Sequence, residues 1–341
     1  MRQPVTRDAT SAALRGFVEE ALARHFGASR TIVHFERKAS SYQTSFVTEE
    51  LGVRLDDGRE VSLLFKDLGR QGLLAPARGV KPQFLLNPLR ELETYRGILS
   101  RARLGTPVCY GAVADSERER YWLFLERVRG LELYQLGELH VWEEVARWLA
   151  RMHGLFAGEI DLLRHRAPLL EYGREYYWTW IRRAKEFVRG SLARKEVHGI
   201  DWLADCYDRL VDSLVELPHT LVHGDFNASN VLVQTQSQET RVCPVDWEMA
   251  AIGPGLVDLA SLISGQWSEA QRNTLVQAYR VALRPNEGWP SSEPALLDAL
   301  DRCRLHLAVQ WLGWAREWSP PAEHAQDWLG EALRLAETLA L

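Results

Sequence analysis

The sequence predicts an α+β fold of two lobes, a β-rich first lobe with one key helix and a mostly helical second lobe. The chain has 341 residues, which is too long for one ordinary core. Short apolar segments of strand character are frequent before Gly130, whereas apolar residues recur at helical spacing after it. Residues 220–247 are an exception, with two strand-like runs inside the helical part. We therefore expect lobes at 1–127 and 128–341, with a cleft between them.

The first lobe is expected to begin with a helix and to continue as a sheet. Residues 8–26 place apolar side chains at helical spacing. Three strands are predicted next, in the segments TIVHFE, SFVTEELGVRL and VSLLFK, and Asp57-Gly58 predicts a hairpin between the last two. Prolines and glycines make residues 69–88 a long connection.

The key helix of the first lobe is expected in the segment NPLRELETYRGILSR. Asn87 is a suitable N-cap there, because proline is favoured at the first helical position and Pro88 follows directly. Two further strands, Val108–Val113 and Tyr121–Val128, would complete the sheet.

The second lobe is predicted to be helical around a short hairpin. Apolar residues of Trp142–Phe156 fall on one helix face, and helical spacing returns at 170–215 and from 256 to the C-terminus. The runs VLVQ and RVCPVDW are the two exceptional strands. A hairpin-like return would set the start of the first strand beside the end of the second.

Composition excludes several classes of partner. The net charge of −5 and the pI near 6.1 provide no basic surplus to neutralise nucleic-acid phosphates. No apolar run approaches the ~20 residues that a membrane span needs, and charges interrupt the N-terminus too often for a secretory signal. The four cysteines are scattered, without metal-like spacing. We expect a cytoplasmic protein that binds neither nucleic acid nor a membrane; its oligomeric state is open.

The segment LVHGDFNASNVLV concentrates polar side chains between apolar ends. Asp225 and Asn230 lie five residues apart in it, and Asp246 follows the second strand of the hairpin. A loop aspartate can accept a hydroxyl proton, and Mg²⁺ prefers carboxylate and amide oxygens together with substrate phosphates. The alternative is that Asp225 and Asn230 only cap turns, which is the commoner role of each residue taken alone.

HGDFNASN followed by VDWEMAAIGPGLVDLA resembles the signature of the aminoglycoside phosphotransferase and choline kinase-like family, whose members have a protein kinase-like fold. The resemblance implies that Asp225 is the catalytic base and that Asn230 and Asp246 hold Mg²⁺. Asp258 would brace the loop from a helix. Glu248 is open between a further ligand, a substrate contact and a surface carboxylate.

The same resemblance implies an ATP (or GTP) site in the first lobe. Lys66 ends an apolar strand and would hold phosphates, although a solvated strand lysine is the plain alternative. Glu91 fits the orienting helix glutamate better than Glu93 does. The backbone of Glu126 and Val128 would offer hydrogen bonds to adenine.

The expected phosphate loop, RKASSYQT, departs from the pattern because it contains no glycine. Glycine normally lets backbone N–H groups approach phosphate closely. Ser40, Ser41 and Thr44 could donate through hydroxyls and amides instead.

Three functions follow from these observations. The first is an ATP-dependent phosphotransferase acting on a hydroxyl of a small molecule. The second is a non-catalytic nucleotide-binding protein, which the glycine-free loop keeps open. The third is a protein kinase, which is disfavoured because eleven residues between Asp246 and Asp258 leave little room for a peptide-docking loop.

The acceptor is not identified by the sequence. The segment EYGREYYWTW offers carboxylates and aromatic rings for a cationic acceptor, and neighbouring arginines would suit an anionic one equally well. The first set comprises Glu171, Glu175, Tyr176, Tyr177, Trp178 and Trp180, and the second Arg174, Arg182 and Arg183.

Overall fold

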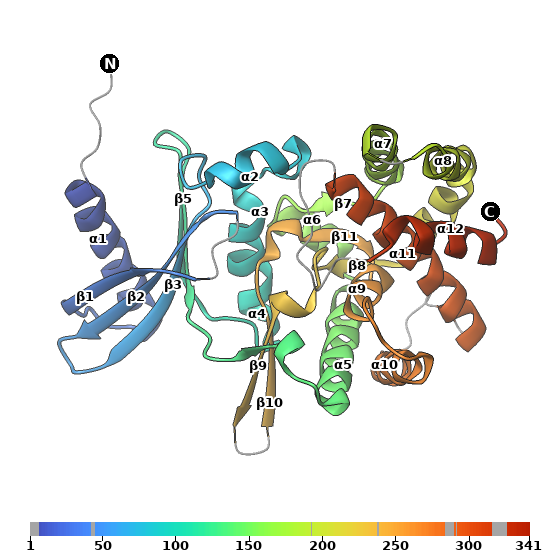
Figure 1. The fold of residues 1–341 in the computed structure, drawn as a ribbon. Helices are drawn as coiled ribbons and strands as arrows, with labels where there is room; N and C mark the ends of the chain where they lie inside the picture. Colours follow the sequence, from blue (N-terminus) through green and yellow to red (C-terminus); the bar gives the residue numbers. More distant parts are fainter. Residues whose placement is uncertain are drawn as a thin grey trace. The chain divides into compact units, whose positions relative to one another are not determined.

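A computed structural model provides the structure of the chain. It describes residues 7–41, 45–191, 193–236, 239–283, 290, 292–315 and 326–341. The fold is α+β, as predicted, with an antiparallel sheet in the first part and mostly helices in the second (Figure 1). The chain divides into two compact units. The first unit comprises Met1–Gly79 and Asn87–Arg129, and the second comprises Val80–Leu86 and Gly130–Leu341.

The first unit is built on a five-stranded antiparallel sheet in the order β1-β2-β3-β5-β4. All five predicted strands are present. Gly58 has φ +84°, which suits the predicted turn between β2 and β3, since this region favours glycine. The bounds are β1 Ile32–Ala39, β2 Val47–Leu55, β3 Glu60–Asp67, β4 Cys109–Asp115 and β5 Arg120–Glu126.

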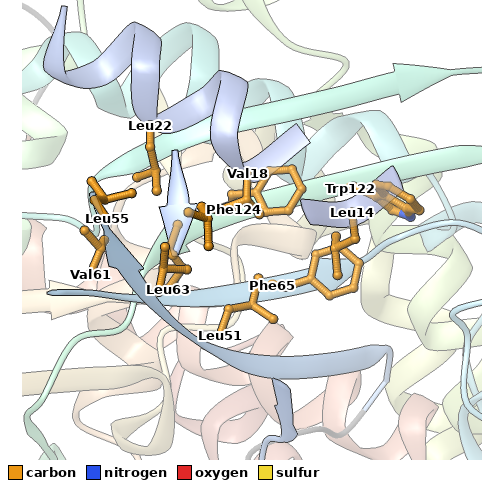
Figure 2. Close-up of a cluster of buried hydrophobic side chains, with 12 residues drawn as sticks. Leu14, Val18, Leu22, Leu51, Leu55, Val61, Leu63, Phe65, Trp122 and Phe124 are labelled. Atoms are coloured by element: carbon orange, nitrogen blue, oxygen red, sulfur yellow. The ribbon is translucent and has the colours of Figure 1, made fainter. Parts of the chain in front are cut away.

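Helix α1 (Arg7–Phe26) packs against this sheet and confirms the predicted first helix. Leu14, Val18 and Leu22 recur every fourth residue, so they lie on one face of the helix. They are buried together with strand residues that include Phe65 and Phe124 (Figure 2). Burying each such side chain stabilises the fold by about 1.5–3 kcal/mol.

The key helix of the first unit follows the sequence prediction closely. The Asn87 side chain accepts a hydrogen bond from the Leu89 N–H over 3.0 Å, and Pro88 opens α3 (Pro88–Glu93). The helix continues as a π-helical turn, Thr94–Leu99, and ends with α4 (Ser100–Ala102). Such turns are rare in proteins, and those that occur are often found at functional sites. The preceding connection contains the short helices α2 (Ala75–Val80) and η1 (Gln83–Leu85), which the proline and glycine content concealed.

The second unit is mostly helical, as expected. Among the described residues, no helix is long and apolar enough to cross a membrane. The α-helices are α5 Leu139–Phe156, α6 Ile160–Arg166, α7 Arg174–Ser191, α8 Arg194–Val215, α9 Leu256–Leu262, α10 Glu269–Ala282, α11 Glu293–Trp314 and α12 Trp328–Thr338.

Two small sheets interrupt the helices of the second unit. In the first, β9 (Val231–Gln236) and β10 (Glu239–Pro244) form the predicted hairpin, extended by β6 (Leu131–Glu132). The second sheet was not predicted and has the order β7-β11-β8. Its strands are too short for an alternating pattern to be visible in the sequence: β7 Leu170–Glu171, β8 His219–Val222 and β11 Ala251–Pro254.

Candidate active site

The polar segment of the second unit is a loop that leaves β8 through Gly224. This glycine has φ +80°, and a Cβ added there would lie 2.3 Å from the backbone oxygen of Met249. Both the conformation and the close approach require glycine. The loop then places Asp225 and Asn230 before β9 begins.

Asp258, on α9, braces this loop as predicted. Its Oδ2 accepts a hydrogen bond from the His223 N–H over 2.7 Å, and its Oδ1 accepts one from the Gly224 N–H over 2.9 Å. His153 Nε2 lies 3.3 Å from Asp258 Oδ2, and the Tyr279 hydroxyl is 2.8 Å from His153 Nδ1. A buried carboxylate with three donors is stably positioned. Asp258 therefore fixes the backbone of the loop at His223 and Gly224.

His223 connects the loop to the segment that carries Asp246. Its Nε2 donates to the backbone oxygen of Val245 over 2.9 Å, so Nδ1 is the acceptor for the Asp225 N–H at 3.3 Å. The imidazole is therefore a structural element rather than a proton donor to a substrate.

Two asparagine amides position the Asp225 carboxylate. Asn227 Nδ2 donates to Oδ1, and Asn230 Nδ2 donates to Oδ2 over 2.9 Å. The Ser261 hydroxyl donates to Asn227 Oδ1 over 3.0 Å and so fixes the first amide. The position of Asp225 is thus determined from both sides.

The environment of Asp225 makes its carboxyl group a weaker acid than an ordinary aspartate. Burial of the group raises its pKa to about 7, and the nearby carboxylates of Asp246 and Glu248 contribute to that rise. Asn230 and Lys81 act in the opposite direction. A carboxyl group with a pKa near neutrality can take up and release a proton at physiological pH.

Asp246 follows β10 in a left-handed conformation, with φ 64° and ψ 63°. This conformation is unusual for a residue with a side chain and is often retained at functional sites. The Val245 N–H donates to the Asn230 backbone oxygen over 2.8 Å, and Val231 pairs with Pro244 in the hairpin. The predicted ligands Asn230 and Asp246 are thereby brought to one place.

The donor set at this place fits Mg²⁺. One amide and one carboxylate are hard oxygen ligands, and Mg²⁺ normally completes its shell with water and substrate phosphates. The repulsion among Asp225, Asp246 and Glu248 also favours a bound cation. Within the described part of the chain, no three His, Cys, Asp or Glu side chains form a metal site by themselves.

Lys81 is a residue of this site that sequence reasoning missed. It belongs to the segment 80–86 of the second unit, and its Nζ forms an ion pair with Glu248 Oε2. Only 5% of the Lys81 side chain and 19% of the Glu248 side chain are exposed. A lone lysine in a connection rich in proline and glycine carries no recognisable signal, because its partner is 167 residues away in the sequence.

In the first unit, Lys66 and Glu91 form a buried ion pair. Lys66 Nζ lies 2.7 Å from Glu91 Oε2 and 2.9 Å from Oε1, so β3 and α3 are connected by both carboxylate oxygens. Glu93, the alternative partner, instead binds Arg96 at the surface. The structure places Lys66 with Glu91 and away from bulk solvent.

The other nucleotide-site candidates differ in what they can offer. Ser40 is buried, and its N–H donates to the Thr48 oxygen, whereas Ser41 is exposed in a turn. Thr44 lies outside the described residues. The Glu126 N–H already donates to the Val108 oxygen over 2.8 Å. Val128 makes no hydrogen bond to another described residue.

The acceptor candidates lie on α7 and just before it. Glu171 binds Arg164, and Glu175 binds Arg182, both at the surface. Arg174 pairs with two aspartates of α8. Tyr176, Tyr177 and Trp180 are buried, Trp178 is half-buried, and Arg183 lies near Trp180. Most of these side chains therefore have structural partners already.

Comparisons with known proteins agree with this arrangement. The model of the family described as "Phosphotransferase enzyme family" matches residues 84–295, which is more than half of the chain. A comparison with curated protein sequences found no significant match.

Three solved structures show the fold. A choline kinase from Cryptosporidium parvum Iowa II is 17% identical, with 97% of this chain and 94% of that chain covered and a TM-score of 0.57. The Plasmodium vivax ethanolamine kinase is 10% identical, with coverages of 100% and 96% and a TM-score of 0.57. The GDP complex of wild-type aminoglycoside 2'-phosphotransferase-IIIa is 14% identical, with coverages of 95% and 97% and a TM-score of 0.54. The predicted kinase-like α+β fold is confirmed.

Proposed function

Because the chain belongs to the phosphotransferase enzyme family, we propose that it transfers the γ-phosphate of ATP to a hydroxyl group of a small molecule. The position of Asp225 between the amides of Asn227 and Asn230 carries this proposal. A turn cap would not need two amides on its carboxylate and a second carboxylate, Asp258, behind its loop. Such support is typical of a group whose position determines a reaction rate.

Asp225 acts as the base that orients and deprotonates the acceptor hydroxyl. Its carboxylate has both oxygens fixed, and its pKa of about 7 suits proton uptake near neutral pH. Positioned bases of this kind contribute roughly 10²–10⁴ to the rate. The phosphoryl group passes directly from nucleotide to acceptor, so positioning and charge stabilisation contribute more than covalent catalysis does.

The first lobe, residues 1–127, binds the nucleotide in this proposal. Lys66 holds phosphate oxygens while Glu91 fixes its ammonium group. Val128 binds the adenine through its backbone, with Glu126 beside it, and Ser40 and Ser41 belong to the phosphate loop. One of the similar structures is a complex with GDP, which supports a purine nucleotide, ATP or GTP. The second lobe, residues 128–341, provides the catalytic loop and the acceptor site.

Asn230 and Asp246 would hold Mg²⁺, which neutralises charge on the transferred phosphoryl group when it is bound. The side-chain nitrogen of Asn230 donates to the Asp225 carboxylate, so the side-chain oxygen of Asn230 faces away from Asp225 and can bind the metal ion. Asp246 contributes a carboxylate from a constrained backbone. Metal binding is thus assigned to Asn230 and Asp246, and proton acceptance to Asp225.

ADP release with Mg·ATP across a panel of hydroxyl compounds tests the proposal. Asp225→Asn should lower turnover at least about a hundredfold and should retain nucleotide binding. Saturation at ~100 Kd stabilises a fold by roughly 2.7 kcal/mol, which a thermal melt detects. Asp161→Asn is the matched control, because that side chain is 94% exposed.

Equal turnover by wild type and Asp225→Asn on a true acceptor would remove Asp225 from the mechanism. Nucleotide binding without turnover by wild type on any acceptor would favour the non-catalytic nucleotide-binding alternative. Phosphorylation of peptides in preference to small alcohols would favour the protein kinase alternative.

A further inference from the structure

We propose that Tyr279 is a positioning residue for phosphoryl transfer, acting on the catalytic loop (residues 223–230) through His153 and Asp258. The inference rests on the proposed function, in which the Asp225 carboxylate must be held against the acceptor hydroxyl. It gives a part in the reaction to α10, which packs against α5 (Figure 1) and carries none of the residues assigned above to proton acceptance or metal binding.

Three buried side chains form a path of hydrogen bonds from α10 to the catalytic loop. The Tyr279 hydroxyl lies 2.8 Å from His153 Nδ1, and His153 Nε2 lies 3.3 Å from Asp258 Oδ2. The other oxygen of Asp258 accepts the Gly224 N–H over 2.9 Å. Since Asp225 follows Gly224 directly, the path ends at the backbone of the proposed base.

The chemistry of the three groups determines which of them donates. Asp258 accepts backbone N–H groups, and a carboxylate has no proton to give, so His153 must present Nε2–H to it. In a neutral imidazole Nδ1 is then an acceptor, and the Tyr279 hydroxyl is its donor. Burial raises the pKa of Tyr279 well above its ordinary value, so the hydroxyl keeps this proton. Tyr279 therefore selects the form of the ring that Asp258 requires.

Packing restrains the plane of the His153 ring but does not distinguish its nitrogens. The Thr220 hydroxyl donates to the His153 backbone oxygen over 2.8 Å, and a Cβ added to Gly255 would lie 2.7 Å from Nδ1. A half-turn of the imidazole keeps its outline while it exchanges each nitrogen with a carbon. The hydrogen bonds to Tyr279 and Asp258 distinguish the two orientations. Without the Tyr279 hydroxyl, only one of these two restraints is left.

A second tyrosine–histidine pair provides a matched control. The Tyr207 hydroxyl lies 3.0 Å from His306 Nδ1, and both side chains are fully buried. Among the described residues, none is hydrogen-bonded to His306 Nε2. This pair therefore resembles Tyr279–His153 in burial and geometry, but it does not continue to the catalytic loop.

The test compares Tyr279→Phe with Tyr207→Phe in the full chain. Each variant loses one buried hydroxyl, so urea unfolding should show similar losses of stability. Hydrogen exchange of the loop amides, measured by mass spectrometry on peptides that contain His223 and Gly224, should be about tenfold faster in Tyr279→Phe than in Tyr207→Phe. The value of kcat, from ADP release on an acceptor of the wild type, should fall about tenfold in Tyr279→Phe alone. The Kd for Mg·ATP should stay the same in both variants.

His153→Leu tests whether Tyr279 acts through the imidazole. This change interrupts the path, so it should also accelerate loop exchange and lower kcat, whereas His306→Leu should do neither. Adding Tyr279→Phe to His153→Leu should change kcat by less than about twofold, because the two residues act as one unit. If Tyr279→Phe does not fold, His153→Leu and His306→Leu make the same comparison of loop exchange and kcat.

Equal loop exchange in Tyr279→Phe and Tyr207→Phe would overturn the inference. Faster exchange with an unchanged kcat would overturn it as well, since Tyr279 would then be structural only. Losses of kcat that multiply in the double variant would show that Tyr279 does not act through His153. None of these results affects the proposed function, which fails separately if wild type transfers phosphate to no acceptor.

Discussion

Asn230 Nδ2 lies 2.9 Å from Asp225 Oδ2 and 3.0 Å from the backbone oxygen of the same aspartate. The proposed base and the proposed metal ligand therefore share a hydrogen bond. The Asn230 side-chain nitrogen donates both of its hydrogen bonds to Asp225, so the side-chain oxygen of Asn230 remains for a different partner. A change at position 230 should consequently affect both proton acceptance and Mg²⁺ dependence.

Asn230→Asp should move the activity of the enzyme to higher pH. Asp225 must be ionised to accept a proton, so with a pKa of about 7 the wild-type rate should fall as the pH drops below that value. A carboxylate at position 230 would disfavour ionisation of Asp225 and raise its pKa further. The pH dependence of kcat/KM measures this shift, and a displacement to lower pH would contradict the assigned hydrogen bond.

Lys66→Met should destabilise the first unit by about 3–5 kcal/mol, because it removes the ammonium group from a buried ion pair with the Glu91 carboxylate. The two side chains are only 10% and 3% exposed. Lys66→Met/Glu91→Leu should be less destabilised than the single variant. Urea unfolding measures both values. Arg96→Met is the control on the same helix, since Arg96 is 51% exposed and its pair with Glu93 should contribute less than about 1 kcal/mol.

Gly224→Ala should reduce both stability and turnover. A left-handed conformation costs a residue with a Cβ roughly 1–2 kcal/mol, and here the added carbon also meets the Met249 oxygen at 2.3 Å. Relief of that clash must shift either the Met249 backbone or the loop that continues into Asp225. Gly158→Ala is the control, because no heavy atom lies within 4 Å of its added Cβ. Thermal melts and ADP release compare the variants; equal behaviour of the two would mean that the loop adapts freely.

The stability of the protein should decrease in mild acid because of His306. Burial lowers the pKa of this imidazole to about 3, from the ordinary value of 6.5. Below about pH 6.5 the unfolded chain takes up a proton that the folded state excludes, so the contribution is complete above that pH and is lost as the pH falls.

His306→Gln provides the test of this pH dependence. The free energy of unfolding, measured by urea titration between about pH 7 and 4, should depend less steeply on pH in the variant. The difference should approach about 1.4 kcal/mol per pH unit. A slope identical to that of wild type would show that His306 does not titrate in this range.

The sequence predicts the large helices and strands and the centre of the site. These features could be predicted because each depends on residues that are close together in the sequence. The five strands of the first unit alternate or are bounded by turns, and Asn87-Pro88 marks a helix start. Asp225, Asn230 and Asp246 are recognisable because one loop and one hairpin hold them. The sheet β7-β11-β8 could not be predicted, since strands of two to four residues have no visible period. The partner of Glu248 could not be predicted either, because Lys81 lies far away in the sequence.

The segment 80–86 groups with the second unit although the chain on both sides of it belongs to the first. The polypeptide thus changes unit after Gly79, after Leu86 and again after Arg129, and neither unit is a contiguous stretch of the gene product. A fragment that begins at Gly130 would lack Lys81 and, with it, the ion pair between Lys81 and Glu248. Cutting the chain at residue 130 should therefore not give a second unit that folds normally on its own. Any fragment or circular permutant of the second unit would have to include residues 80–86 as well.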